Sequence, residues 1–100
     1  MILRMDEVIH EFTAEVADPD GHTYTARALG RKRAGRSVWE GWLEFAPLGG
    51  GGMVRRGPIE TTQPNREALA YWASGVEPVY LEGALERAIA ARAERRGRSR

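Results

Sequence analysis

The sequence contains no cysteine among its 100 residues. No disulfide framework and no thiolate metal site can therefore hold the fold. No apolar run approaches the roughly twenty residues that a membrane-spanning helix requires. The segment 1–5 is followed at once by Asp6 and Glu7, which is unlike a signal peptide. From these absences we expect a cytoplasmic bacterial protein without a membrane partner.

The chain also lacks a large excess of either charge, because it has 15 basic and 14 acidic residues and a net charge of +1. A uniformly basic chain is excluded. The charge is unevenly spread, since residues 92–100 hold five arginines and only one glutamate. A chain of this length buries about two-thirds of its unfolded surface, enough for one domain. We expect a single domain over residues 1–93 and an Arg-rich flexible tail over residues 94–100.

Alternation of apolar and polar residues predicts strands in the first half of the chain. Residues 8–16 place Val8, Phe12 and Val16 on one face and glutamates on the other, and residues 37–45 alternate in the same way. A period of two residues is typical of a half-buried strand.

Turn residues separate these runs. Asp18–Gly21 reads Asp-Pro-Asp-Gly, and the four successive glycines 49–52 indicate a loop. Pro58 predicts that the last strand lies at an edge or carries a bulge. We predict a four-stranded antiparallel meander over residues 8–17, 22–30, 37–46 and 53–62.

The second half changes to helical periodicity at Pro64. Proline is favoured in the first turn of a helix, Thr62 or Gln63 can cap it, and Gly75 is a natural stop. We predict helices over residues 64–74 and 78–95, both packed on one face of the sheet. The resulting fold class is α+β.

Aromatic side chains are expected to close the core: Phe12, Tyr24, Trp39, Phe45 and Trp72. Tyr71 is assigned to the apolar side of the first helix. The alternation leaves Trp42 on the outer sheet face, between Glu40 and Glu44. Trp42 is either an exposed interface anchor, since tryptophan is enriched at hot spots, or is covered by a loop such as residues 46–52. The first interpretation makes Trp42, Glu40 and Glu44 candidate protein-interaction residues, with a homodimer through the outer face or an edge strand as one possible assembly.

Two basic clusters are candidates for binding a polyanion. One lies in the predicted turn between the second and third strands, and the other in the tail: Arg31, Lys32, Arg33 and Arg36, and Arg95, Arg96, Arg98 and Arg100. Arginines that neutralise phosphates release counterions and so favour nucleic-acid binding. The alternatives are a charged turn that discourages edge-to-edge association and arginines that complement a helix C-terminus. Binding becomes reasonable if the two clusters share one face.

Motifs for catalysis or for metal binding are weak. His10 and His22 match no zinc spacing with Glu11 or Asp20, and the Asp-Pro-Asp-Gly turn lacks the other ligands of a calcium loop. Carboxylates four residues apart on a strand lie roughly 13 Å apart, farther than the glycosidase pairs at about 5–10 Å. We expect no metal, no cofactor and no recognisable catalytic residue.

Four short stretches resemble a group of small uncharacterised bacterial proteins: residues 39–45, 60–64, 70–73 and 79–85. The resemblance covers about residues 8–90 and implies a compact domain, with no activity, cofactor or site attached to it. The sequence thus favours a domain that acts by binding, as a protein-interaction or oligomeric accessory module. The alternatives are a nucleic-acid-associated protein that uses the two basic clusters, and a small enzyme with a site built from glutamate and histidine.

Overall fold

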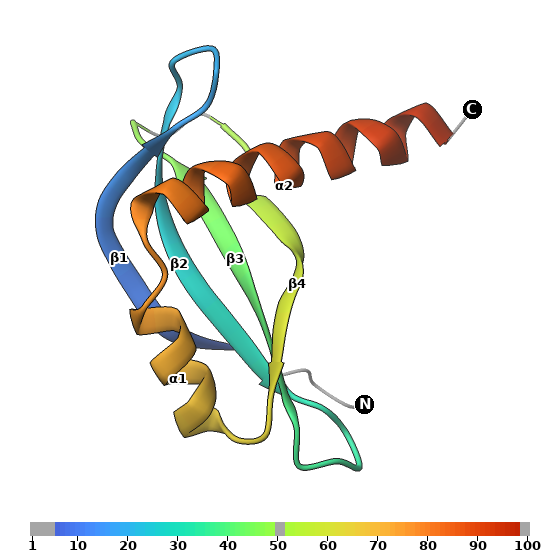
Figure 1. Ribbon diagram of the computed structural model, residues 1–100. Helices are drawn as coiled ribbons and strands as arrows, with labels where there is room; N and C mark the ends of the chain where they lie inside the picture. The colour runs from blue at the N-terminus through green and yellow to red at the C-terminus, as the bar shows by residue number, and fades with distance from the viewer. Residues whose placement is uncertain (1–5, 50–51, 99–100) are drawn as a thin grey trace.

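The computed structural model describes residues 6–49 and 52–98, with side chains placed up to residue 91. Its elements are β1 (Glu7–Ala17), β2 (Thr23–Lys32), β3 (Trp39–Pro47), β4 (Arg55–Gln63), α1 (Arg66–Ser74) and α2 (Pro78–Arg98). The strands form one antiparallel sheet in the order β1-β2-β3-β4, and both helices pack on the same face of it (Figure 1). The predicted α+β meander followed by two helices is confirmed.

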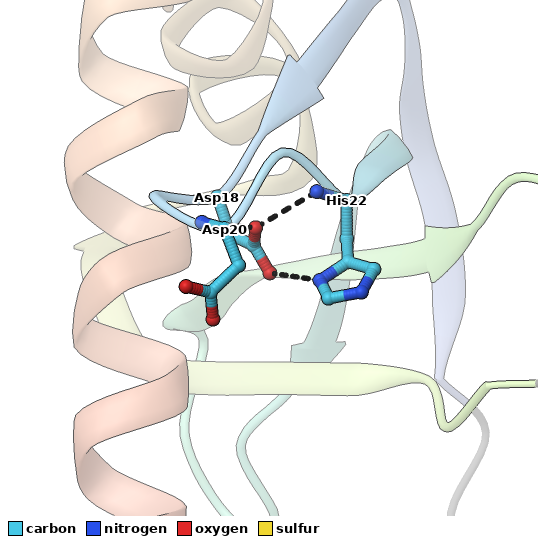
Figure 2. Close-up of side chains that lie close together, drawn as sticks. All are labelled: Asp18, Asp20 and His22. Carbon is cyan, nitrogen blue, oxygen red and sulfur yellow. Dashed lines mark hydrogen bonds and ion pairs between the residues drawn. The ribbon is translucent and has the colours of Figure 1, made fainter.

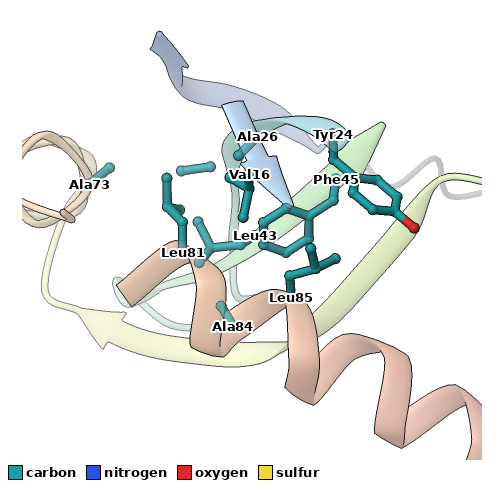
Figure 3. Packing of buried hydrophobic residues seen from close by; sticks show 10 residues of the cluster. Val16, Tyr24, Ala26, Leu43, Phe45, Ala73, Leu81, Ala84 and Leu85 are labelled. Carbon is teal, nitrogen blue, oxygen red and sulfur yellow. The ribbon is translucent and has the colours of Figure 1, made fainter. Parts of the chain in front are cut away.

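The core lies between the sheet and the helices. β3 places Leu43 and Phe45 on the helix side, and Leu81 and Leu85 of α2 pack against them (Figure 3). Burying one such side chain contributes about 1.5–3 kcal/mol. The complete buried cluster is Val16, Tyr24, Ala26, Ala28, Leu43, Phe45, Ala73, Leu81, Ala84 and Leu85. Trp39, predicted to belong to it, is only partly buried, because it lies at the far end of the sheet where β3 begins.

Helix α1 is seated on two glycines. Gly30 of β2 and Gly41 of β3 are register partners, and a Cβ atom at either position would overlap a methyl group of Leu69. The missing side chains leave a hollow on the sheet that the fully buried Leu69 fills. The two glycines therefore set how closely α1 approaches the sheet.

Strand β1 departs from strict alternation near its start. Its register with β2 shifts between Val8 and His10, which is the mark of a bulge. Ile9 consequently packs against the core, near Gly30, while Val8 is 40% exposed. The predicted uninterrupted alternation over residues 8–16 is wrong at this point, because the bulge moves one residue out of phase.

Helix α1 is capped by Asn65, whose side-chain oxygen accepts the N–H of Ala68 at 2.8 Å. The prediction that Thr62 or Gln63 caps it is wrong, because β4 continues to Gln63 and both residues belong to the strand. Gly75 ends the helix as predicted.

Helix α2 runs to Arg98, three residues past its predicted end. Residues 94–98, expected to form a flexible tail, therefore have helical backbone, and residues 99–100 lie outside the described part of the chain. Among the side chains that are described, Ala88 is the last buried one on α2. Figure 1 shows the final turns continuing past β4, the edge strand. Neither helix in the described ranges is long and apolar enough to cross a membrane.

Candidate functional site

The outer sheet face, opposite the helices, does not expose its tryptophan. Trp42 pairs with Leu29 across β2 and β3, yet its side chain is 0% exposed. The guanidinium carbons of Arg56 and Arg31 lie 4.3 and 5.1 Å from the indole ring centroid. The expectation of an exposed anchor is wrong, because long arginine side chains can cover apolar surface with their stems and place their charge over an aromatic ring.

The indole N–H of Trp42 is buried without a hydrogen-bond partner among the described residues. An unpaired buried donor costs about 1–3 kcal/mol. Cation–π contacts with two arginines offset part of that cost. Trp42 is thus fully buried and has no exposed surface with which to contact a partner.

The two glutamates beside Trp42 are ion-paired. Arg27 lies 2.6 Å from Glu44, and Arg31 lies 3.4 Å from Glu40. Each such pair near the surface contributes at most about 1 kcal/mol. Because their charges are engaged by the strand arginines, Glu40 and Glu44 do not form a free acid–base pair.

The basic tip at the β2–β3 turn is partly neutralised. Arg31 faces both Glu40 and Asp6, the latter at 3.7 Å, and Arg33 lies 4.0 Å from Glu40. Lys32 and Arg36 are exposed, and within the described residues neither has an ion pair. Two of the four predicted polyanion-binding side chains at the tip, Lys32 and Arg36, thus have no ion pair in the described part of the chain.

The two basic clusters lie at opposite ends of the sheet. The tip joins β2 to β3, whereas Ile89 of α2 lines a cleft with the β1–β2 turn at the other end (Figure 1). A polyanion surface shared by the two clusters stays a prediction, and the separation of their backbones argues against it. In the second cluster, the backbone of Arg95, Arg96 and Arg98 lies in the last turns of α2, and their side chains are not described. Arg100 lies outside the described residues.

The β1–β2 turn is closed by the carboxylate of Asp18 (Figure 2). Its Oδ1 accepts the backbone N–H groups of Asp20 and His22, both at 2.9 Å, and its Oδ2 lies 3.2 Å from His22 Nδ1. Burial alone would raise the pKa of Asp18, but the hydrogen bonds from His22 and Asp20 outweigh it and hold the pKa below its ordinary value of 3.8. The turn predicted from the Asp-Pro-Asp-Gly pattern is confirmed by the backbone bond from Gly21 N–H to the Asp18 carbonyl.

The same three side chains bring potential metal-ligating atoms within 4.8 Å of one another. Both oxygens of Asp18 already accept hydrogen bonds, so a cation would compete with the contacts that close the turn. The His22 side chain is 73% exposed, and solvent therefore screens its interaction with the carboxylate. We assign Asp18 a structural role in the turn. His10 stacks edge-on against Phe12 within β1.

A second polar cluster joins β4 to α2. Ile59 and Thr61 pair with consecutive residues of β3, so Glu60 lies between them at a bulge. The Glu60 carboxylate accepts the Tyr80 hydroxyl and an N–H of Arg87 at 3.2 Å. Burial raises the pKa of Tyr80, and the hydrogen bond to Glu60 raises it further. These contacts hold the start of α2 on the sheet.

The exposed aromatic surface of the protein lies at the junction of the two helices. A groove of about 580 Å³ is lined by Tyr71, Trp72, Val76, Glu77, Val79 and Tyr80. Tyr71 is 83% and Val79 71% exposed, and the rings of Trp72 and Tyr80 meet edge-on at 6.5 Å. We call these six residues the helix-junction groove.

The electrostatics of the helix-junction groove favour a cation. Glu77 is exposed at its rim. The negative end of α1 and the positive end of α2 both lie at this junction, so the helix dipoles by themselves favour neither charge. The faces of the tyrosine and tryptophan rings attract cations as well. The Tyr80 ring already has the guanidinium carbon of Arg87 at 5.5 Å, so the two features that favour an added cation are the Glu77 carboxylate and the ring faces of Tyr71 and Trp72.

Sequence reasoning missed this groove, because it assigned Tyr71 to the buried side of α1. The buried residues of α1 are Leu69 and Ala73, and a residue two positions after Leu69 lies about 200° around a helix. Helical spacing alone would have placed Tyr71 on the opposite face.

No protein-family model, curated protein or solved structure matches this chain. The function is therefore inferred from the chain's own geometry.

Proposed function

We propose that the protein acts by binding, as a protein-interaction module whose contact surface is the helix-junction groove and whose partner presents a basic segment there. The observation that carries the proposal is the exposure of Tyr71 and Val79 beside Glu77 around one groove. Tyrosine and tryptophan are the residues most often found at the energetic centre of protein interfaces.

The outer sheet face supports this choice by contrast. Its large aromatic residue, Trp42, is buried, and the neighbouring glutamates Glu40 and Glu44 are paired with arginines. A partner docking there would have to displace those ion pairs before it reached apolar surface. At the helix-junction groove, the apolar and aromatic surface is already accessible to a partner.

Calorimetric titration with two synthetic peptides tests the proposal. One peptide is built from arginine and alanine, and its counterpart has glutamate in place of arginine. We expect only the first to bind, and more weakly at high salt, because exposed charges are screened. Tyr71→Ser should weaken binding about two- to fivefold, since an exposed cation–π contact contributes about 0.5–1 kcal/mol.

A matched pair of variants provides the control. Val79→Ser removes an exposed valine from the groove and should weaken binding, whereas Val8→Ser removes one from β1 and should not. Equal binding of both peptides, or equal effects of the two valine variants, would refute the proposed surface.

A further inference from the structure

Helix α2 carries unlike charges in its two halves. Residues 78–87 hold Glu82 and Glu86, both exposed, and one arginine, Arg87, which is bound to Glu60. Residues 88–98 hold four arginines and one glutamate. Two copies of this helix are therefore complementary in charge when they run antiparallel and repel when they run parallel.

The end of the basic half continues beyond this chain's own sheet (Figure 1). The helix has 21 residues, about 30 Å at 1.5 Å per residue. Its described buried side chains end at Ala88, and Figure 1 shows the last turns extending past β4 into space.

The acidic half begins at the helix-junction groove. Glu77 precedes α2 directly, and Val79 and Tyr80 belong to its first turn. A second α2 that runs antiparallel to the first therefore brings its arginine-bearing end toward Glu77 and the aromatic rings. Its charge is the one that the groove selects.

We propose that the occupant of the helix-junction groove is the arginine-rich end of α2, residues 92–98, from a second copy of this chain. This inference rests on the proposed function and names its partner. Two antiparallel α2 helices are related by a two-fold axis, so each copy fills the groove of the other. Such an assembly closes at two copies and leaves no groove open for a third. The arginine peptide and the second copy therefore compete for the same groove.

Charge reversal tests this dimer. Glu82→Arg/Glu86→Arg makes both halves of α2 basic, and Arg92→Glu/Arg96→Glu makes both halves acidic. In sedimentation experiments over a concentration series at low salt, the wild-type chain should be a dimer and each variant alone a monomer. Mixing the two variants should restore association, but more weakly than in the wild-type chain, since the two α2 helices then carry opposite charges while only one of the two grooves receives a basic end.

Controls separate this contact from a general effect of charge. Glu11→Arg/Glu15→Arg changes the same number of charges on exposed positions of β1 and should leave the dimer intact, whereas Tyr71→Ser should weaken it. Circular dichroism of each variant establishes that it is folded.

Different results overturn the two proposals. A wild-type chain that stays monomeric, or a charge-reversal variant that stays dimeric by itself, refutes the dimer. If the arginine peptide still binds to that monomer and Tyr71→Ser weakens it, the groove is a contact surface for another protein. If the peptide fails to bind and a dimer forms regardless of Tyr71→Ser, the groove itself is refuted.

Discussion

Replacing Gly41 by alanine tests how helix α1 packs on the sheet. The added methyl group would point at Leu69, which packs over Gly41 and its register partner Gly30. Overpacking of this kind typically costs about 1–3 kcal/mol. Gly41→Ala should therefore lower the free energy of unfolding by that amount.

A double-mutant cycle with Leu69→Ala tests the cause of that loss. Leu69 is fully buried, so Leu69→Ala alone should cost about 2–5 kcal/mol. In the double variant the new methyl group at position 41 no longer meets the leucine and fills part of the cavity. The combined loss should be smaller than the sum by about 0.5–3 kcal/mol.

Urea unfolding measures all four proteins. The control is Gly83→Ala in α2, where the nearest atom to the added carbon is the flexible end of Arg87 at 3.4 Å. There the change should stabilise the protein by up to about 1 kcal/mol, because alanine is the better helix former. If Gly41→Ala does not change the free energy of unfolding, or if the two losses are additive, Gly41 does not set how Leu69 packs on the sheet.

Three further predictions concern Trp42, Asp18 and Tyr80, and each is measured by unfolding experiments. Trp42→Ala should cost about 3–5 kcal/mol without changing the affinity for the arginine peptide, whereas an interface anchor would lose affinity as well. The pKa of Asp18 is lowered in the folded state, so its carboxylate stabilises the fold above pH about 4. This contribution is lost as the pH falls through the folded pKa. The difference in unfolding free energy between wild type and Asp18→Asn should therefore shrink in acid. Because the folded pKa of Tyr80 is raised, its hydroxyl stabilises the fold below pH about 10 and the contribution is lost at higher pH. Tyr80→Phe should therefore be less stable than wild type at neutral pH and should lose less stability in alkali.

Patterns along the chain predicted the fold because they act locally. Alternation and turn residues located every strand, and Pro78 and Gly75 marked helix boundaries that the structure confirms. The wrong predictions concern positions at which tertiary contacts determine the local structure. The bulge at Ile9 and the seating of Leu69 on Gly30 depend on the neighbouring elements, which no local pattern contains.

The candidate site was harder to predict because exposure depends on what lies over a residue. Alternation placed Trp42 on the outer face, but which side chains from β2 and β4 cover it follows from the register of three strands. The helix-junction groove likewise depends on how α1 and α2 meet. Of its residues, Tyr71 and Val79 could have been predicted to be exposed, because each lies about 200° around its helix from a buried leucine, Leu69 and Leu81 respectively.

The indole N–H signals of the three tryptophans provide the most direct measurement, because each reports on a different surface. Trp39 lies near the basic tip, Trp42 under the outer-face arginines and Trp72 in the helix-junction groove. In a ¹⁵N–¹H spectrum of the monomeric variant Arg92→Glu/Arg96→Glu, whose groove is open, the Trp72 signal should shift as the arginine peptide is added, while the other two stay in place. A shift of the Trp42 signal with Trp72 unmoved would show that binding occurs on the outer sheet face, contrary to this account.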